Sequence, residues 1–262
     1  MSHASLTTEQ IQQFNNNGYL IIENAFSLGE VERIRDCIKI DPQLAAEAKT
    51  NQNYEGEGIG TRLVNRQSLS DDIYSAYVQS NRIVAPLEQI FDDKIQYYYH
   101  LTMLKNPNTG GWQWHQDYGY HYKEFFYPKF ISVMFALDPA TKENGCLRVL
   151  KGSNHLGRLE HQQSGSQLIT NPERAAIALE HMEEVYCEMS PGSIMFFDGN
   201  ILHASGPNNS EQSRWSFVIS YVPASNIIVI PDPPKDLLTP IEPWSDEKVQ
   251  ATAQRFWEGL RA

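Results

Sequence analysis

Hydrophobic residues recur every three to four positions near both ends of the chain, which is the spacing of helices with one buried face. Thr7 or Thr8 can cap the first of these segments, and Asn17-Gly18 can stop it. Glu30, three residues after Ser27, completes a capping box at the second. Helices are therefore expected over about 9–16, from Ser27 onward, over about 71–91 and over about 246–260.

Between these helices the pattern changes to short apolar runs, rich in β-branched and aromatic residues and separated by Gly, Pro and Asn turns. Strands are expected at 19–22, 95–105, 130–138, 146–150, 184–189, 193–198, 215–223 and 227–230. Many short strands with regular turns favour a β-sandwich or jelly-roll barrel. We expect a single domain over 1–262, with a helical part over about 7–92, a jelly-roll core over about 93–232 and a C-terminal helix over about 245–260.

Residues 41–66 are polar and glycine-rich, which predicts a long loop. Its glycines at 56, 58 and 60 suggest that residues 50–66 form a lid over a binding site. A tolerated surface insertion is the alternative.

Composition and charge narrow the function. The formal net charge is -11, which does not suit binding to a phosphate backbone, so no nucleic-acid partner is expected. The three cysteines have no ligand-like spacing, and no apolar run is long enough for a membrane span or a secretory signal. We expect a cytoplasmic protein that acts on a small molecule without a membrane partner; its oligomeric state is left open.

His115 and Asp117 stand two positions apart after a run of aromatic residues. In a strand, alternate side chains share a face, so the imidazole and the carboxylate would project together. Completed by a distant histidine, such a pair forms the 2-His-1-carboxylate triad, which leaves one face of a ferrous ion open. Alone, the triplet also fits two surface residues on a strand.

His203 follows an apolar strand and precedes a polar turn, and Arg214 stands eleven residues later at the start of another apolar strand. A cation at the start of a buried strand is costly unless it is paired. A guanidinium there suits bidentate binding of the far carboxylate of a dicarboxylic acid. A charge at the exposed end of a strand is the alternative for Arg214.

Taken together, these motifs resemble the phytanoyl-CoA dioxygenase family of Fe(II)- and 2-oxoglutarate-dependent oxygenases, over about residues 7–230. The matching features are the early Gly-Tyr-Leu-Ile-Ile, His115-Gln116-Asp117, the run from Glu143-Asn144-Gly145 to His155, the strand from Pro191-Gly192 to His203-Ala204-Ser205, and Arg214.

The resemblance implies a mainly β fold with flanking helices around a double-stranded β-helix (jelly-roll, cupin-like) core. It implies that His115, Asp117 and His203 bind Fe(II) and are the catalytic centre. It also implies that Arg214, assisted by Ser205, binds the C5 carboxylate of 2-oxoglutarate, and that O2 is the second co-substrate. Succinate and CO2 would be released as a C–H bond is hydroxylated; because Asp117 is present, hydroxylation is favoured over halogenation.

Further positions follow from the same resemblance. Met103 and Gln116 are expected in the co-substrate pocket. A cation from an earlier segment can also touch 2-oxoglutarate: Arg62 is our choice, with Arg66 and Lys105 as alternatives.

The substrate itself stays open. Tyr118, Tyr120, His121 and Tyr122 follow the proposed ligands and could wall a substrate pocket, or form an ordinary aromatic surface stretch. The acidic charge and a C-terminus without a peroxisomal tripeptide favour a small polar or zwitterionic metabolite. The alternatives are an acyl-CoA hydroxylase of the same family and a non-catalytic cupin-like metal-binding module.

Overall fold

The computed structural model describes residues 5–51 and 59–262. The predicted capping box of Ser27 with Glu30 starts helix α2, and Thr7, one of the two expected caps, starts helix α1 and forms a further capping box with Gln10. The helices are α1 (Thr8–Asn17), α2 (Leu28–Ile40), α3 (Pro42–Glu47), α4 (Ile73–Val78), α5 (Asn81–Phe91), α6 (Asp117–His121), α7 (Pro172–His181) and α8 (Asp246–Arg261).

The strands form two larger sheets and one hairpin. The large sheet runs β1 (Tyr19–Ile22), β11 (Ile194–Asp198), β6 (Ile131–Ala136), β13 (Arg214–Pro223), β4 (Ile95–Lys105), β3 (Thr61–Arg66) and β2 (Lys49–Asn51), with β14 (Thr239–Pro240) beside β4. The small sheet runs β10 (Glu184–Cys187), β7 (Leu147–Leu150), β12 (His203–Ser205) and β5 (Trp112–His115). The hairpin is β8 (His161–Ser164) with β9 (Gln167–Thr170).

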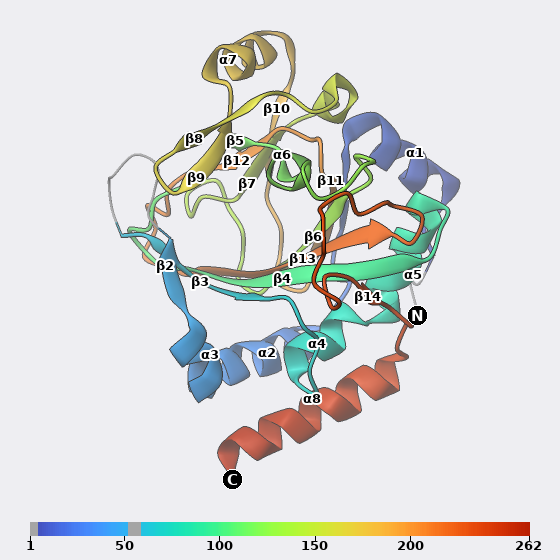
Figure 1. The fold of residues 1–262 in the computed structure, drawn as a ribbon. Coiled ribbons are helices and arrows are strands. Elements are labelled where there is room, and N and C mark those ends of the chain that lie inside the picture. The colour runs from blue at the N-terminus through green and yellow to red at the C-terminus, as the bar shows by residue number, and fades with distance from the viewer. Residues whose placement is uncertain (1–4, 52–58) are drawn as a thin grey trace.

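The two sheets lie one above the other, and the helices α2, α3, α4 and α8 cover the outer face of the large sheet (Figure 1). This is the mainly β jelly-roll architecture with flanking helices that the sequence predicted. Among the described residues, no helix combines the length and apolar character of a membrane span.

Alternation along β6 explains how one strand serves both layers. Ile131, Val133 and Phe135 join the core under the helices, while Met134 packs in the core between the sheets. Ser132 shares the inner face of Met134, because successive strand residues point to opposite sides. Polar groups on this inner face are therefore directed toward the space between the sheets.

Several predicted boundaries were wrong. The segment 41–66 is not one long loop: Asp41 caps α3, and β2 and β3 extend the large sheet. The expected helix over 71–91 is broken, because Ser80 caps a new helix, α5. Residues 227–230 form a single bridge through Ile228 and no strand. Of the predicted lid, residues 52–58 lie outside the described residues.

Candidate metal and co-substrate site

His115 and His203 are cross-strand partners. His115 ends β5, His203 begins β12, and the two are paired in the antiparallel register of the small sheet. Their ring centroids are 4.1 Å apart, and both residues are buried. The sheet therefore brings together two histidines that are far apart in the sequence.

Asp117 completes the group, although not by strand alternation. The strand ends at His115, and Asp117 is the first residue of α6. Its Oδ1 lies 3.4 Å from His203 Nε2 and 3.8 Å from His115 Nε2. One possible ligand atom from each residue falls within 4.8 Å of the others, so the three can hold one metal ion.

Each ligand side chain is oriented through its other polar atom. His115 Nδ1 lies 2.7 Å from the Gln113 carbonyl oxygen, and His203 Nδ1 lies 3.1 Å from that of Ile201. A carbonyl can only accept, so each Nδ1 carries the proton and each Nε2 presents a lone pair. Ser132 Oγ donates to Asp117 Oδ2 at 2.5 Å. Such outer contacts are typical of metal sites.

The protonation states also suit a cation. Burial, aided by the nearby His203, lowers the pKa of His115 to about 3, so its imidazole is neutral. Burial alone would raise the pKa of Asp117, but His203, His115 and Ser132 outweigh it and hold that pKa below its usual value. Two imidazoles and one carboxylate with open positions form the donor set of non-haem Fe(II) sites.

A cavity of ≈ 110 Å³ lies between the sheets beside these ligands, and Arg214 lies at its wall. Arg214 is 3% exposed, and within the described part of the chain its Nε and Nη1 have no hydrogen-bond partner. Burial lowers the pKa of Arg214 to about 10, so it remains charged at neutral pH. A buried, charged and unpaired guanidinium is costly, and a carboxylate ligand would pair it.

The neighbourhood of Arg214 adds more polar groups. Ser216, two residues along β13 on the same face, has a buried hydroxyl without a partner among the described residues. Ser205 and Met103, both expected from the sequence, line the cavity with Arg214. A dicarboxylate with one end at the metal ligands and the other at Arg214 fits this donor set. No pattern in the sequence pointed to Ser216.

Lys105, one of the alternatives for contacting the co-substrate, lies behind Ser205. Its Nζ donates to Ser205 Oγ at 3.3 Å, to the Gly145 carbonyl at 3.4 Å and to the Gly206 carbonyl. Burial and the charge of Arg214 lower the pKa of Lys105 well below its usual value. Lys105 therefore fastens the turns that position Ser205.

Gln116 does not point into the co-substrate cavity, contrary to the expectation. Its amide nitrogen donates to the carbonyls of Gly157 and Asn200, and its oxygen accepts from the Leu159 N–H. The side chain is fully buried. Gln116 thus anchors the backbone between the two ligands of this segment to neighbouring loops.

His161 supports the same segment. Its Nε2 accepts the Gln116 backbone N–H at 3.0 Å. Gly119 permits this approach, because a Cβ there would lie 2.4 Å from the His161 ring.

Arg62 and Arg66 also lie away from the cavity. Along β3, Leu63 and Asn65 line the space near the ligands, so the alternating Arg62 projects from the opposite face, where it is exposed. Arg66 is paired with Glu47 and Asp72. The choice of Arg62 as a co-substrate contact disagrees with this placement.

A second cavity of ≈ 330 Å³ opens beside the ligands and shares Tyr99, Leu101, Trp112, His115 and Asp117 with the first. Its wall also includes Tyr120 and His121, which the sequence placed in a substrate pocket; Tyr118 instead packs in a buried aromatic cluster.

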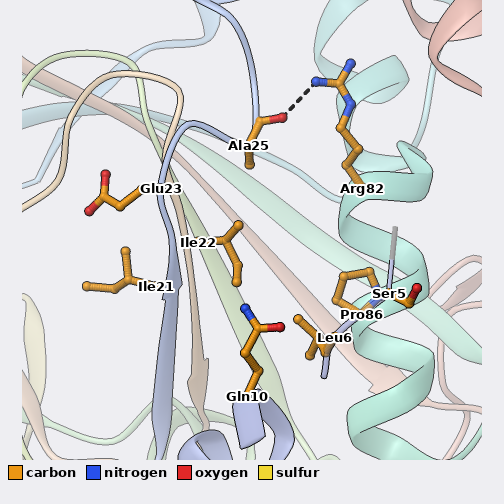
Figure 2. A pocket seen from close by; sticks show the side chains of 9 residues that line it. All are labelled: Ser5, Leu6, Gln10, Ile21, Ile22, Glu23, Ala25, Arg82 and Pro86. Atoms are coloured by element: carbon orange, nitrogen blue, oxygen red, sulfur yellow. Dashed lines mark hydrogen bonds between the residues drawn. The ribbon is translucent and has the colours of Figure 1, made fainter. Parts of the chain in front are cut away.

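A separate cavity of ≈ 260 Å³ lies between α1, β1 and α5 (Figure 2). Its one arginine, Arg82, uses all three guanidinium nitrogens on Ala25, Glu30 and Asp246. Among the residues that the structure describes, that cavity consequently offers no spare cation, and the metal-binding chemistry lies at the His115–Asp117–His203 group.

Comparison with known proteins agrees with this geometry. A sequence model of the family described as Phytanoyl-CoA dioxygenase (PhyH) matches residues 14–216. A probable alpha-ketoglutarate-dependent hypophosphite dioxygenase of Stutzerimonas stutzeri is 28% identical over 231 residues, which cover 82% of this chain and 78% of the relative. L-proline trans-4-hydroxylase of Streptomyces griseoviridis is 24% identical over 253 residues, which cover 88% and 93%.

Solved structures show the same fold. The structure of EctD from S. alaskensis with 2-oxoglutarate and 5-hydroxyectoine superposes with a TM-score of 0.74 at 20% identity, covering 93% of this chain and 87% of that one. The carbocyclase SnoK from nogalamycin biosynthesis gives a TM-score of 0.71 at 16% identity, covering 92% and 99%. With the family match spanning most of its length, the chain belongs to the phytanoyl-CoA dioxygenase family of Fe(II)- and 2-oxoglutarate-dependent oxygenases.

Proposed function

We propose that this Fe(II)- and 2-oxoglutarate-dependent dioxygenase hydroxylates an unactivated C–H bond of a small metabolite, with release of succinate and CO2. The relatives named above act on small molecules such as L-proline, which supports a small substrate. The proposal takes residues 1–262 as one catalytic domain. It places the enzyme in the cytoplasm, and the three free, buried cysteines suit a reducing compartment.

In this proposal His115, Asp117 and His203 hold the iron. Bound Fe(II), with 2-oxoglutarate and O2, supplies the oxidant that removes the hydrogen atom; the protein supplies binding, orientation and exclusion of water. The two Nδ1–H groups and Ser132 fix the ligands before the metal arrives. Such preorganisation keeps the ligand geometry from shifting during the reaction.

The observation that carries the proposal is the unpaired guanidinium of Arg214 beside the metal ligands. Its guanidinium, whose Nε and Nη1 have no partner among the described residues, can pair with the far carboxylate of 2-oxoglutarate in a bidentate contact. Ser205 and Ser216 stand ready to add hydrogen bonds. A purely structural metal site would not need this group, so the non-catalytic module is disfavoured.

Two further observations refine the chemistry. Asp117 supplies a carboxylate at the position that a halide needs in halogenating relatives, which favours hydroxylation. The cavity of ≈ 330 Å³ is near the lower end for small-molecule pockets, which favours a metabolite over a whole acyl-CoA.

Oxygen-dependent succinate release tests this function. The protein, supplied with Fe(II) and 2-oxoglutarate, should form succinate in air and none under argon. His115→Ala, Asp117→Ala and His203→Ala should each abolish it, while Arg62→Ala, on the opposite face of β3, should not. Full succinate release by the Asp117→Ala protein at unchanged iron content would refute the assignment.

A further inference from the structure

The described lining of the ≈ 330 Å³ cavity is poor in positively charged side chains. Lysine and arginine are absent from its lining among the described residues. Residues 1–4 and 52–58, outside the described part, contain neither in their sequence. Glu124 lies behind this wall, where its carboxylate contacts Tyr98 and His121 of the lining. Apart from the metal, an oxyanionic substrate would therefore meet no lysine or arginine of the described lining here, and oxyanions in protein sites are bound mainly by Arg and Lys.

Glu124 sets the direction of the hydrogen bonds along this wall. Its Oε2 accepts from Tyr98 Oη and from His121 Nδ1, the latter at 2.9 Å. Burial would raise the pKa of Glu124, but hydrogen bonds from His121 and Tyr98 lower it overall, so it is a carboxylate at neutral pH. A carboxylate can only accept, and both protons point to it.

These hydrogen bonds leave acceptor atoms on the wall of the cavity. A His121 tautomer with its proton on Nδ1, toward Glu124, presents a lone pair at Nε2, and Tyr99 Oη lies 3.4 Å from that atom. When Tyr99 donates to His121, both Tyr98 and Tyr99 keep lone pairs on oxygen. Tyr98, Tyr99 and His121 all line the cavity, so the cavity suits a hydrogen-bond donor.

Aromatic faces add to the same preference. Trp112, Tyr99 and Tyr120 line the cavity, and none of them has a cation over its ring among the described residues. Elsewhere the faces of Trp114 and Tyr122 are covered by arginines. A free aromatic face attracts a cation, most strongly where water is excluded.

We propose that this cavity recognises a cationic amine of the substrate, bound by the acceptor atoms of Tyr98, Tyr99 and His121 and by the uncovered aromatic rings, with Glu124 as the positioning residue. The proposal rests on the proposed function, since it names the substrate class of the same site. It sets the chain apart from the hypophosphite and methylphosphonate enzymes among its relatives, whose named substrates are oxyanions.

Matched probes test it. Calorimetric titrations under argon, with the Fe(II)- and 2-oxoglutarate-loaded protein, would compare choline with 3,3-dimethylbutan-1-ol, and L-prolinamide with cyclopentanecarboxamide. Each pair differs mainly in charge. At least one cation should bind about tenfold more tightly than its uncharged counterpart, a difference of about 1.4 kcal/mol. Hypophosphite and methylphosphonate should bind more weakly than either cation.

Equal binding within both pairs, tighter binding of an oxyanion, or no binding of either cation at millimolar concentration would overturn the proposal. Glu124→Gln should bring the cation-to-neutral ratio toward one, and Glu173→Gln, an exposed carboxylate on α7, should leave it unchanged. A ratio does not depend on the amount of active protein, so partial misfolding cannot imitate this result. An unchanged ratio in Glu124→Gln would remove Glu124 from the account.

The proposed function and the proposed amine site can be disproved separately. Selective amine binding without succinate release in air would count against the proposed function. Succinate release combined with oxyanion selectivity would count against the amine site alone.

Discussion

Ser132 Oγ donates a hydrogen bond of 2.5 Å to Asp117 Oδ2, the carboxylate oxygen on the side away from the histidines. Ser132 lies on β6 of the large sheet, whereas the two histidines belong to the small sheet. The metal ligands are therefore held from both layers, and the geometry of the site depends on how the sheets face one another.

Loss of this hydroxyl should weaken metal binding. Ser132→Ala frees Asp117 to rotate, so iron affinity should fall by roughly 10- to 100-fold, the usual range for outer-sphere partners of metal ligands. Competition with a chelator measures it. Ser220→Ala is the control, because Ser220 contacts Ser132 but is not hydrogen-bonded to Asp117. Equal iron affinity of Ser132→Ala and wild type would mean that Asp117 needs no such support.

Arg214→Ala should raise the 2-oxoglutarate requirement while iron stays bound. The lost contact is a charge-assisted, bidentate one worth about 1.5–3 kcal/mol, which corresponds to roughly 10- to 150-fold weaker binding. A titration of succinate release against 2-oxoglutarate measures the shift. Arg62→Ala, exposed on the far face of β3, should behave as wild type. A raised 2-oxoglutarate requirement in Arg62→Ala, with Arg214→Ala behaving as wild type, would restore Arg62 as the co-substrate contact.

Gln116→Ala should act on stability instead of co-substrate affinity. It leaves the buried Leu159 N–H and the carbonyls of Gly157 and Asn200 without their partner. Unpaired buried groups of this kind should cost about 2–4 kcal/mol together. Urea unfolding measures the loss, with Gln162→Ala on the exposed face of β8 as control. Unchanged stability with weaker 2-oxoglutarate binding would place Gln116 in the pocket after all.

His100 should make the fold sensitive to acid. Burial lowers its pKa from 6.5 to about 3. Below pH 6.5 the unfolded chain takes up a proton that the folded protein refuses, so stability falls as the pH drops from 6.5 toward 3. The loss should reach about 2 kcal/mol by about pH 5, at about 1.4 kcal/mol per pH unit.

His100→Gln lacks this proton and should lose correspondingly less stability between about pH 7.5 and about pH 5. Free energies of unfolding for both proteins at the two pH values give the comparison. Equal losses of unfolding free energy in wild type and His100→Gln would show that His100 is protonated in the folded state.

The sequence predicted the parts of the site that follow from local rules. Strands β4 and β11 were expected almost at their observed bounds, because their apolar runs are long and end at clear turns. The His115–Asp117 pair was found through strand alternation, although Asp117 in fact begins a helix. Residues two positions apart are close enough for their side chains to meet, whether both lie on one strand or a helix begins at the second.

The parts that failed depend on tertiary contacts. The face on which Arg62 projects is decided by the pairing of β3 with β4, and the polar segment 41–66 gave no sign that β3 exists. Ser132 and Ser216 are ordinary serines in apolar strands, and only the opposing sheet gives them a role. Gln116 was expected in the pocket from resemblance, but its neighbours in space are carbonyls from distant loops.

The proposed function requires iron held by His115, Asp117 and His203 within reach of a carboxylate bound by Arg214. Anaerobic addition of 2-oxoglutarate to the Fe(II)-loaded protein tests it directly, because a 2-keto acid in contact with Fe(II) produces a visible charge-transfer absorption. We expect the absorption to saturate at one iron per chain, to vanish in His203→Ala, and to need far more 2-oxoglutarate in Arg214→Ala. An absorption of full strength in His203→Ala, or unchanged 2-oxoglutarate dependence in Arg214→Ala, would contradict the account.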